Sequence, residues 1–162
     1  VSGLVVFAKT SKALSRLNDM FRKGEVKKTY WAMVQTPPSE SEGTLTNWLV
    51  RNEKKNKSYA YNHEVPNAKK AILKYKTVGQ TEHYTLLEVN LLTGRHHQIR
   101  CQLSAIGCPI KGDLKYGARR SNPDGSISLL SRTVEFIHPV SKENISVVSP
   151  LPAEKVWDNF RK

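Results

Sequence analysis

Apolar residues recur along the chain with two different periods, and these periods predict its elements. Residues Leu4–Ala8 form a continuous apolar run with β-branched and aromatic members, which is typical of a buried strand. A helix is predicted over Lys12–Arg22, where large apolar residues recur on one face. Thr10 or Ser11 can cap its start, and Gly24 can end it. The residues on the apolar face are Leu14, Leu17 and Phe21.

Most of the remaining chain is predicted to form strands, because β-branched and aromatic residues dominate short runs bounded by turn-forming residues. The predicted strands are Lys27–Val34, Leu45–Leu49, Ser58–Tyr61, Lys70–Val78, His83–Leu92, Leu129–His138 and Ile145–Ser149. Short connections between sequential strands favour an antiparallel or mixed sheet.

Two further helices are predicted in the second half of the chain. One runs over Arg95–Ile106, with Thr93 as its N-cap and Gly107 as its stop. The other runs over Ala153–Phe160 and has Val156, Trp157 and Phe160 on its apolar side. We therefore expect one α+β domain over residues 1–162, with a mixed, mostly antiparallel sheet and a few helices packed on it.

The charge balance points to a polyanionic partner. The 162 residues contain 26 Lys and Arg against 14 Asp and Glu, which gives a net charge of +12. Such an excess is typical of nucleic-acid binding, and a solvated basic surface is the alternative. A membrane partner is not expected, because no basic amphipathic helix and no apolar run of about 20 residues is present. Cys101 and Cys108 are expected to be reduced, buried thiols.

Histidine and cysteine cluster within Leu91–Gly117, which raises the question of a metal site. His96 and His97 are adjacent, so their rings point in different directions on a helix. Cys101 and Cys108 lack the close pairing of structural zinc sites. We expect no metal here, and the segment contains no phosphate-binding glycine loop.

The arginines of the same segment are stronger candidates for binding. Arg95 and Arg100 would lie about 140° apart around an α-helix, so one can face outward while the other points inward. An inward arginine needs an anion, because an unpaired buried charge is very costly. From the residues alone, that anion is either a carboxylate of the protein or a phosphate of a ligand.

Aromatic rings next to lysines are the second candidate for binding. Tyr30 and Trp31 follow Lys27 and Lys28, a combination that can stack a base and hold its phosphate. Neighbours in a strand point to opposite faces, so at least one of the two rings is expected to pack inward. Other aromatic residues are expected to serve packing; they are Trp48, Tyr59, Tyr61, Tyr75 and Trp157.

Three segments carry residues at spacings typical of one known family, namely VSGLVVFAKT at the start, KKTYWAMV, and Leu91–Gly117. Together they resemble the catalytic domain of RNA pseudouridine synthases of the RluA family. The start, VSGLVVFAKT, resembles the tail of the signature H-R-L-D-x-x-T-S-G-L, with Val1 in place of threonine. The segment KKTYWAMV resembles the strand that bears the active-site tyrosine. The segment Leu91–Gly117 is similar to L-x-T-G-R-x-H-Q-I-R-x-H-L-x-x-x-G-x-P-I-x-G-D-x-x-Y-G.

The resemblance implies an activity and a set of site residues. Family members isomerise a specific uridine of rRNA or tRNA to pseudouridine through the aspartate of H-R-L-D, without a cofactor or a metal. Tyr30 matches the tyrosine that stacks on the flipped base, and Arg100 matches the arginine that pairs with the aspartate. Ile99 matches an apolar residue of the uracil pocket, and Arg95 matches a turn arginine near the RNA backbone. A cytoplasmic monomer is expected.

Lys27 and Lys28 flank the matched tyrosine and are expected to contact RNA. The family's basic surface grips the phosphates around the target and so offsets the cost of flipping a base out of its stack.

The sequence departs from the family pattern at its start. By the motif spacing, the nucleophilic aspartate would be the third residue before Val1, so the 162 residues are expected to be the C-terminal portion of a catalytic domain and inactive alone. Asp19 and Asp113 do not match its position. A non-catalytic RNA-binding module and a basic structural protein remain alternatives. Departures at Cys101-Gln102 and Ser131 are expected to affect packing.

Overall fold

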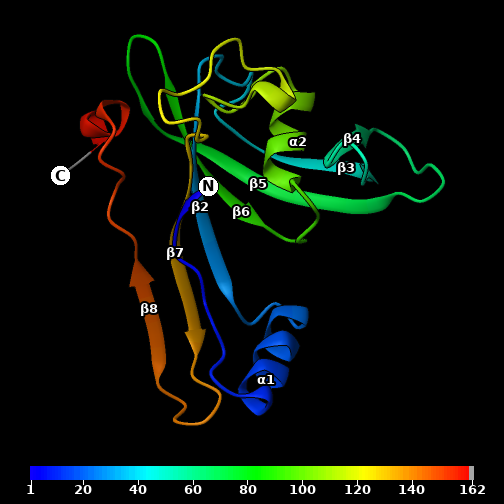
Figure 1. Cartoon of the computed structure of the whole chain (residues 1–162), viewed down its shortest axis with the longest axis vertical. Coiled ribbons are helices and arrows are strands. Elements are labelled where there is room, and N and C mark those ends of the chain that lie inside the picture. The colour runs from blue at the N-terminus through cyan, green and yellow to red at the C-terminus, as the bar shows by residue number, and fades with distance from the viewer. Residues whose placement is uncertain (161–162) are drawn as a thin grey trace. The chain divides into compact units, whose positions relative to one another are not determined.

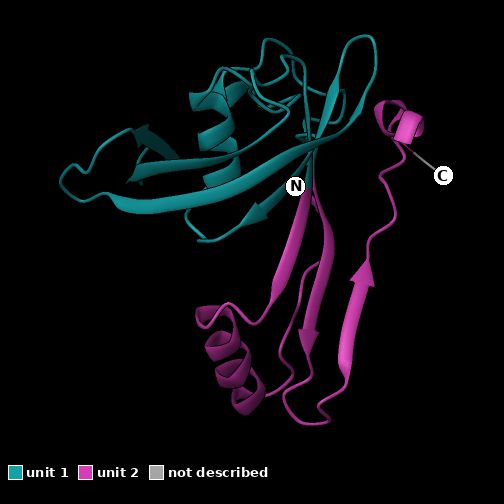
Figure 2. Cartoon of the chain, turned by 180° about the vertical axis from the view of Figure 1, so that it is seen from behind, with its two compact units in different colours: residues 1, 31–129 teal, residues 2–30, 130–162 magenta. Residues whose placement is uncertain are grey.

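The computed structural model describes residues 1–160, which form two compact units (Figure 2). Unit 1 comprises residues 1 and 31–129, and unit 2 comprises residues 2–30 and 130–162. Strand β2 (Lys27–Val34) passes from unit 2 into unit 1 after Tyr30.

Unit 1 is built on an antiparallel sheet with the strand order β6-β5-β3-β4 (Figure 1). Its strands are β3 (Glu42–Asn52), β4 (Lys57–Tyr61), β5 (Lys69–Gln80) and β6 (Thr85–Leu91). The strands follow one another through short turns, as the sequence predicts, and β3 is longer than the predicted Leu45–Leu49. The register shifts between Thr77 and Gly79, where β5 carries an irregularity opposite β6.

One face of this sheet packs against helix α2 (Gln98–Ala105), and the 3-10 helix η1 (Leu114–Tyr116) lies beside α2 (Figure 1). Leu49 of β3 and Ala71 of β5 form a buried cluster with Cys101 and Tyr116, and Ala60 of β4 packs against it. Both cysteines are buried and free, as expected.

Unit 2 contains β1 (Ser2–Gly3), β7 (Leu129–Ile137) and β8 (Asn144–Val148). β1 pairs with β7 in parallel, and β8 pairs with β7 in antiparallel orientation. Gly3 has a φ of 103°, and a Cβ added there would lie 2.3 Å from the Ser131 carbonyl oxygen, so only glycine fits. The expected mixed, mostly antiparallel sheet with a few helices is confirmed.

The predicted strand Leu4–Ala8 is wrong. The Leu4 N–H donates to the Ser131 carbonyl, and the chain then leaves β7 without further pairing. Val5 is 69% exposed and Phe7 is 83% exposed in the described structure. Apolar composition marked the run as buried, but strand formation needs a paired neighbour along its whole length.

Helix α1 (Ser11–Arg22) begins where the sequence predicts. The Thr10 hydroxyl accepts from the Ala13 N–H at 3.0 Å, and the left-handed Gly24 follows the end of the helix with a φ of 72°. The buried face is only partly the expected one. Leu17 and Met20 are buried, whereas Leu14 and Phe21 are exposed.

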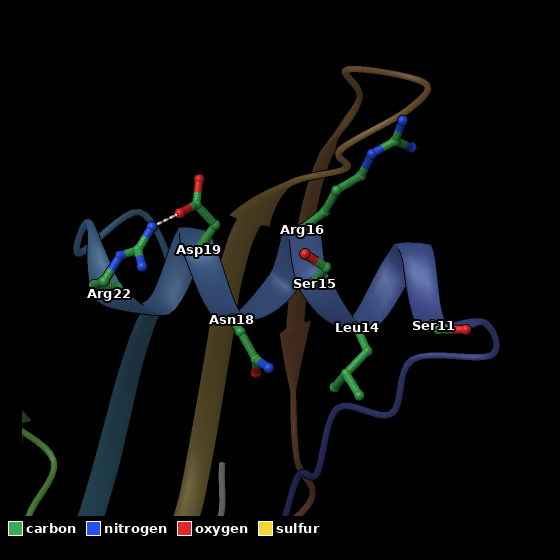
Figure 3. Close-up of a pocket in the computed structure, with 7 residues that line it drawn as sticks. All are labelled: Ser11, Leu14, Ser15, Arg16, Asn18, Asp19 and Arg22. Carbon is green, nitrogen blue, oxygen red and sulfur yellow. Dashed lines mark hydrogen bonds and ion pairs between the residues drawn. The ribbon is translucent and has the colours of Figure 1, made fainter.

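A shallow hollow lies along α1 between the residues drawn in Figure 3. Its carboxylate, Asp19, already pairs with Arg22 and Lys23, as the dashed line to Arg22 indicates. The carboxylate of the hollow is therefore already neutralised by basic side chains of the same helix and the residue after it.

The predicted C-terminal α-helix is a 3-10 helix, η2 (Lys155–Phe160). Trp157 is 1% exposed, and its Nε1–H donates to Glu154 Oε2 at 3.1 Å. The apolar side therefore packs as expected, although Pro150 and Pro152 are followed by a tighter helix than the pattern predicts.

Candidate active site

The loop between β6 and α2 is held in place by hydrogen bonds of the Thr93 and Gln98 side chains. The Thr93 hydroxyl accepts from the Ile72 N–H at 2.9 Å and donates to Gln98 Oε1 at 2.9 Å. Gln98 Oε1 also accepts from the Arg95 N–H at 2.9 Å, and its Nε2 donates to the Ile72 carbonyl at 3.1 Å. The loop is thus tied to β5, and α2 begins only at Gln98. The expected helix start at Arg95 with Thr93 as N-cap is wrong.

This loop also changes the place of Arg95. Because Arg95 precedes the helix, the expected angle of about 140° between it and Arg100 does not apply. The Arg95 Nε–H donates to the Lys70 carbonyl at 2.9 Å, near the start of β5. The expected stop at Gly107 is confirmed, since Gly107 has a φ of 81° and its N–H donates to the Ser104 carbonyl.

Arg100 makes a two-pronged ion pair with Asp113. Its Nε donates to Oδ2 and its Nη2 donates to Oδ1, each at 2.8 Å. The Asp113 side chain is 1% exposed and that of Arg100 is 18% exposed. The hydrogen bonds to this carboxylate raise the pKa of Arg100 further above its ordinary value. Within the described chain, the anion that Arg100 requires is therefore a protein carboxylate.

Gly112, the residue before Asp113, determines where the Asp113 carboxylate lies. Gly112 has a φ of 86°, and a Cβ added there would lie 2.7 Å from the Asn122 side chain and from the Ser126 carbonyl oxygen. Only glycine fits such a position without displacement of the backbone. The turn at Gly112 thus brings Asp113 back toward α2.

His97 holds the other side of Arg100. It has left-handed backbone angles, with φ 52° and ψ 29°, and its ring does not cap the helix. Arg100 Nη1 lies 3.2 Å from His97 Nε2, and His97 Nδ1 lies 2.8 Å from the Tyr116 hydroxyl oxygen. Because a guanidinium only donates, Nε2 accepts, which assigns the proton of the neutral ring to Nδ1.

The surroundings of His97 keep it neutral. Burial, followed by the positive charge of Arg100, lowers the pKa of His97 from its ordinary value of 6.5 to about 4. The Tyr116 hydroxyl accepts from the Ser58 N–H at 2.9 Å, and the Tyr116 ring lies 4.9 Å from Arg100 Cζ. Arg100 is thus fixed by a carboxylate, an imidazole and an aromatic face.

Three of the five N–H groups of Arg100 donate to Asp113 and His97 in the described part of the chain. The remaining two can donate to a second anion. The arginine can therefore act as a fixed, charged donor for a reacting group.

The other predicted site residues lie on both units. Ile99 is buried on α2 in unit 1, next to Arg100. Tyr30 lies in the unit 2 part of β2, where Lys28 Nζ is 5.2 Å from the centre of its ring and Lys27 is exposed. This lysine–ring contact is the arrangement that the sequence suggested for base stacking.

Sequence reasoning missed the roles of His97, Asp113 and Tyr116. The two histidines were considered only as metal ligands, and Asp113 only as a motif residue. Among residues 1–160, no group of three or more His, Cys, Asp and Glu side chains is placed to hold a metal ion. The unsatisfied charge of Arg100 was the one signal that could have pointed to Asp113.

Cys101 and Gln102, where the sequence departs from the family pattern, make structural contacts. Gln102 is fully buried, and its Nε2 lies within hydrogen-bonding distance of Leu45 O, Asn47 Oδ1 and Ala71 O. Burial raises the pKa of the Cys101 thiol to about 11, so it is not a reactive thiolate.

The comparison with known families decides the identity of this fold. The sequence model of a family described as RNA pseudouridylate synthase matches residues 1–105. The chain belongs to this family. Proteins named as uncharacterized RNA pseudouridine synthases are similar over nearly the whole chain. One from Chlorobaculum parvum is 34% identical over 94% of the chain, and one from Bacillus subtilis is 31% identical over 99% of it.

The chain spans about half the length of these relatives, namely 52% of the first and 53% of the second. Two solved human structures share the fold at 23% sequence identity. RNA pseudouridylate synthase domain containing 4 has a TM-score of 0.71 over 89% of this chain and 65% of its own. Domain containing 1 has a TM-score of 0.73 over 94% and 65%.

The resemblance to RluA-type pseudouridine synthases is thus confirmed at the level of family and fold. Relatives with this name are isomerases that modify RNA. No helix within residues 1–160 combines the length and the apolar character that crossing a membrane requires.

Proposed function

We propose that the protein carrying this chain converts a specific uridine of rRNA or tRNA into pseudouridine, acting in the cytoplasm as a monomer. The observation that carries the proposal is the fixed Arg100, which among residues 1–160 keeps two N–H groups free beside its bonds to Asp113 and His97. These 162 residues would form the C-terminal portion of one catalytic domain.

The nucleophile in this proposal is the aspartate of the H-R-L-D motif, which by spacing precedes Val1. The two free N–H groups of Arg100 would donate to its carboxylate and keep it ionised beside the target ribose. Asp113 already holds the Arg100 guanidinium in place, so the carboxylate of the nucleophilic aspartate would bind to a donor whose orientation is fixed in advance.

The family resemblance suggests a role toward the base for Tyr30 and, separately, for Ile99. The Tyr30 ring offers a stacking face for the flipped uracil, and Ile99 offers an apolar wall. The bond between N1 and C1′ breaks, the base turns, and C5 forms the new bond to C1′. The proton leaving C5 is balanced by one taken up at N1, so substrate and product are isomers and no redox cofactor is needed.

RNA affinity would come mainly from phosphate contacts. The net charge of +12 favours a polyanion, and Arg95, Lys27 and Lys28 are proposed to contact the backbone around the target. Binding should then weaken steeply as salt increases, because bound counterions are released on association. A flat salt response would contradict an RNA partner.

Tritium release from C5-labelled uridine in cellular RNA tests the activity. The protein must include the H-R-L-D segment as well as this chain. We expect release with the wild type and none above a no-enzyme control with Arg100→Ala. Salt-dependent RNA binding without any release would favour the second candidate, a non-catalytic RNA-binding module with the same fold.

A further inference from the structure

The sheet of unit 1 has an open face on the side away from α2. In an antiparallel sheet, directly paired residues point to the same side. Leu49 is paired with Ala60, and both pack against the α2 cluster. Their neighbours Trp48 and Tyr61 are also paired with each other, so these two rings point to the opposite side.

Several aromatic and basic residues share this side, which we name the Trp48 face. Its members are Trp48 of β3, Tyr59 and Tyr61 of β4, and Lys70 and Lys74 of β5. β4 is the last strand of the sheet order, so the face continues to an edge.

Aromatic rings and ammonium groups are neighbours on this face. Tyr61, Trp48 and Lys70 form one row across three strands, because Trp48 is paired with both of the others. Lys70 Nζ lies 5.9 Å from the Trp48 ring centre. Lys57, at the start of β4, lies at the margin of the face, with its Nζ 5.3 Å from the Tyr59 ring centre and 5.4 Å from that of Tyr116 on the α2 side. Tyr61 is 41% exposed. Trp48 and Tyr59 are half-buried, so all three rings keep part of their surface available.

The positive charge of the face is not neutralised. Within residues 1–160, no carboxylate forms an ion pair with Lys57, Lys70 or Lys74. The pair Lys76–Glu88, at 3.6 Å, is further along β5 and neutralises only the far end of the face.

We propose that the Trp48 face binds a single-stranded segment of RNA outside the target nucleotide. Bases would stack on Trp48, Tyr59 and Tyr61, while the lysines between them contact phosphates. Aromatic rings interleaved with cations are what a sequence-tolerant single-strand platform needs. An acidic peptide would use the lysines but not the ring faces, and an apolar partner would leave the lysine charges buried and unpaired.

This segment is distinct from the nucleotide at the proposed reaction centre. Arg100 lies on α2, which packs against the other face of the same sheet. The inference rests on the proposed function only in taking RNA as the partner. It assigns a second contact region, which would raise affinity for RNA that has an unpaired stretch near the modified site.

Photocrosslinking locates the contact without any substitution. A 12-nucleotide single-stranded RNA containing 4-thiouridine is irradiated with the full-length protein, and the tryptic peptides are identified by mass spectrometry. We expect crosslinks in residues 58–69, the tryptic peptide that contains Tyr59 and Tyr61. Crosslinks found only in other peptides would overturn the proposal.

Binding of the same RNA, labelled with fluorescein, tests the individual residues by fluorescence anisotropy. We expect Tyr61→Thr and Lys70→Glu each to weaken RNA binding and to raise Kd by at least about fivefold. Lys69→Glu is the matched charge control, since Lys69 is the exposed neighbour paired with Leu49 and belongs to the α2 side. Tyr84→Thr is the matched ring control. The Tyr84 ring also lies beside a lysine, with its centre 5.6 Å from Lys111 Nζ, but Tyr84 is not part of the Trp48 face.

Wild-type affinity in Tyr61→Thr and Lys70→Glu, or an equal loss in Lys69→Glu, would overturn the proposal. Circular dichroism confirms that each variant is folded before its affinity is compared. Neither assay depends on turnover. A protein that releases no tritium can therefore still bind RNA at this face, and an active synthase can fail to bind it there, so the two failures are distinguishable.

Discussion

Arg100 and Asp113 contact each other through two parallel hydrogen bonds of 2.8 Å, between side chains that are 13 residues apart in the sequence. The geometry is the planar fork that arginine forms with a carboxylate and that lysine cannot form. Since the Asp113 side chain is 1% exposed, its charge depends on this partner. The pair therefore fixes the orientation of the guanidinium as well as balancing its charge.

Removal of the Asp113 charge should destabilise the fold. Asp113→Asn leaves Arg100, with an 18% exposed side chain, without its anion, and we expect a loss of about 3 kcal/mol in the free energy of unfolding. Urea denaturation measures the change. Asp19→Asn is the control, because Asp19 pairs with Arg22 and Lys23 on an exposed helix surface and should cause a far smaller loss. Equal losses would contradict the structural importance of the Arg100–Asp113 pair.

Arg100→Lys should separate charge from geometry. The lysine keeps the positive charge near Asp113, but its three N–H groups cannot make both bonds to Asp113, one to His97 and a further one to a second carboxylate, and it lacks the planar fork. We expect turnover to fall by about 100-fold or more while RNA affinity changes little. Tritium release and RNA-binding titrations measure the two effects. A lysine variant with wild-type turnover would show that the fork geometry does not matter.

Tyr30→Phe should separate stacking from proton transfer. The ring stays, so RNA affinity should be kept, whereas turnover should fall by about 100-fold if the hydroxyl takes part in the proton transfer. Tritium release under single-turnover conditions measures the chemical step. Trp31→Phe in the neighbouring position is the control, because the Trp31 Nε1–H contacts Glu88 at 3.4 Å within unit 1. Wild-type turnover in Tyr30→Phe would exclude the hydroxyl from the reaction.

His97 should make stability depend on pH. Its folded pKa of about 4 lies below the ordinary 6.5, so between these values the unfolded chain binds a proton that the folded chain excludes. Stability should therefore fall as the pH decreases from 6.5 to about 4, with no further contribution from His97 below that. The melting temperature measured at intervals across this range tests the expectation.

The matched variant for this test is His97→Asn. Asparagine tolerates the left-handed backbone of His97, with its φ of 52°, and has no proton to gain in this range. The decrease in melting temperature from pH 7 to pH 4.5 should be smaller in this variant than in the wild type. The pKa of His96 is also lowered, chiefly by burial, but its contribution is common to both proteins. Equal decreases would contradict the neutral state of His97.

The strands were predictable because their signals are local. Short runs rich in β-branched and aromatic residues, bounded by turn residues, mark the strands of the β3–β6 sheet, and β3, β4, β5 and β6 are connected by short turns. The prediction of a strand at Leu4–Ala8 was wrong because composition indicates apolar character but not whether a partner strand extends beside the segment. The predicted start of α2 at Arg95 was wrong because the Gln98 side chain bonds to Thr93 and Arg95 in the preceding loop. The helix therefore begins at Gln98, three residues later than predicted.

The site was predictable only in part. The physical argument that Arg100 needs an anion was sound, and the family motif selected this arginine over Arg95. The identity of its partner within the chain depends on the turn at Gly112, which no periodicity reports. The role of His97 depends on a left-handed residue at the start of α2, and this conformation is uncommon for any residue other than glycine.

The turn at Gly112 provides the last test. Gly112→Ala adds a Cβ at a φ of 86° and 2.7 Å from both Asn122 and the Ser126 carbonyl, so we expect a loss of about 3 kcal/mol in the free energy of unfolding. Gly94→Ala is the control, because a Cβ at Gly94 meets nothing within 4 Å and should change stability by less than about 0.5 kcal/mol. Urea denaturation measures both variants. If Gly112→Ala also displaces the neighbouring Asp113, turnover should fall with it, whereas Gly94→Ala should keep wild-type turnover; a fully active Gly112→Ala would show that Asp113 is not positioned by this turn.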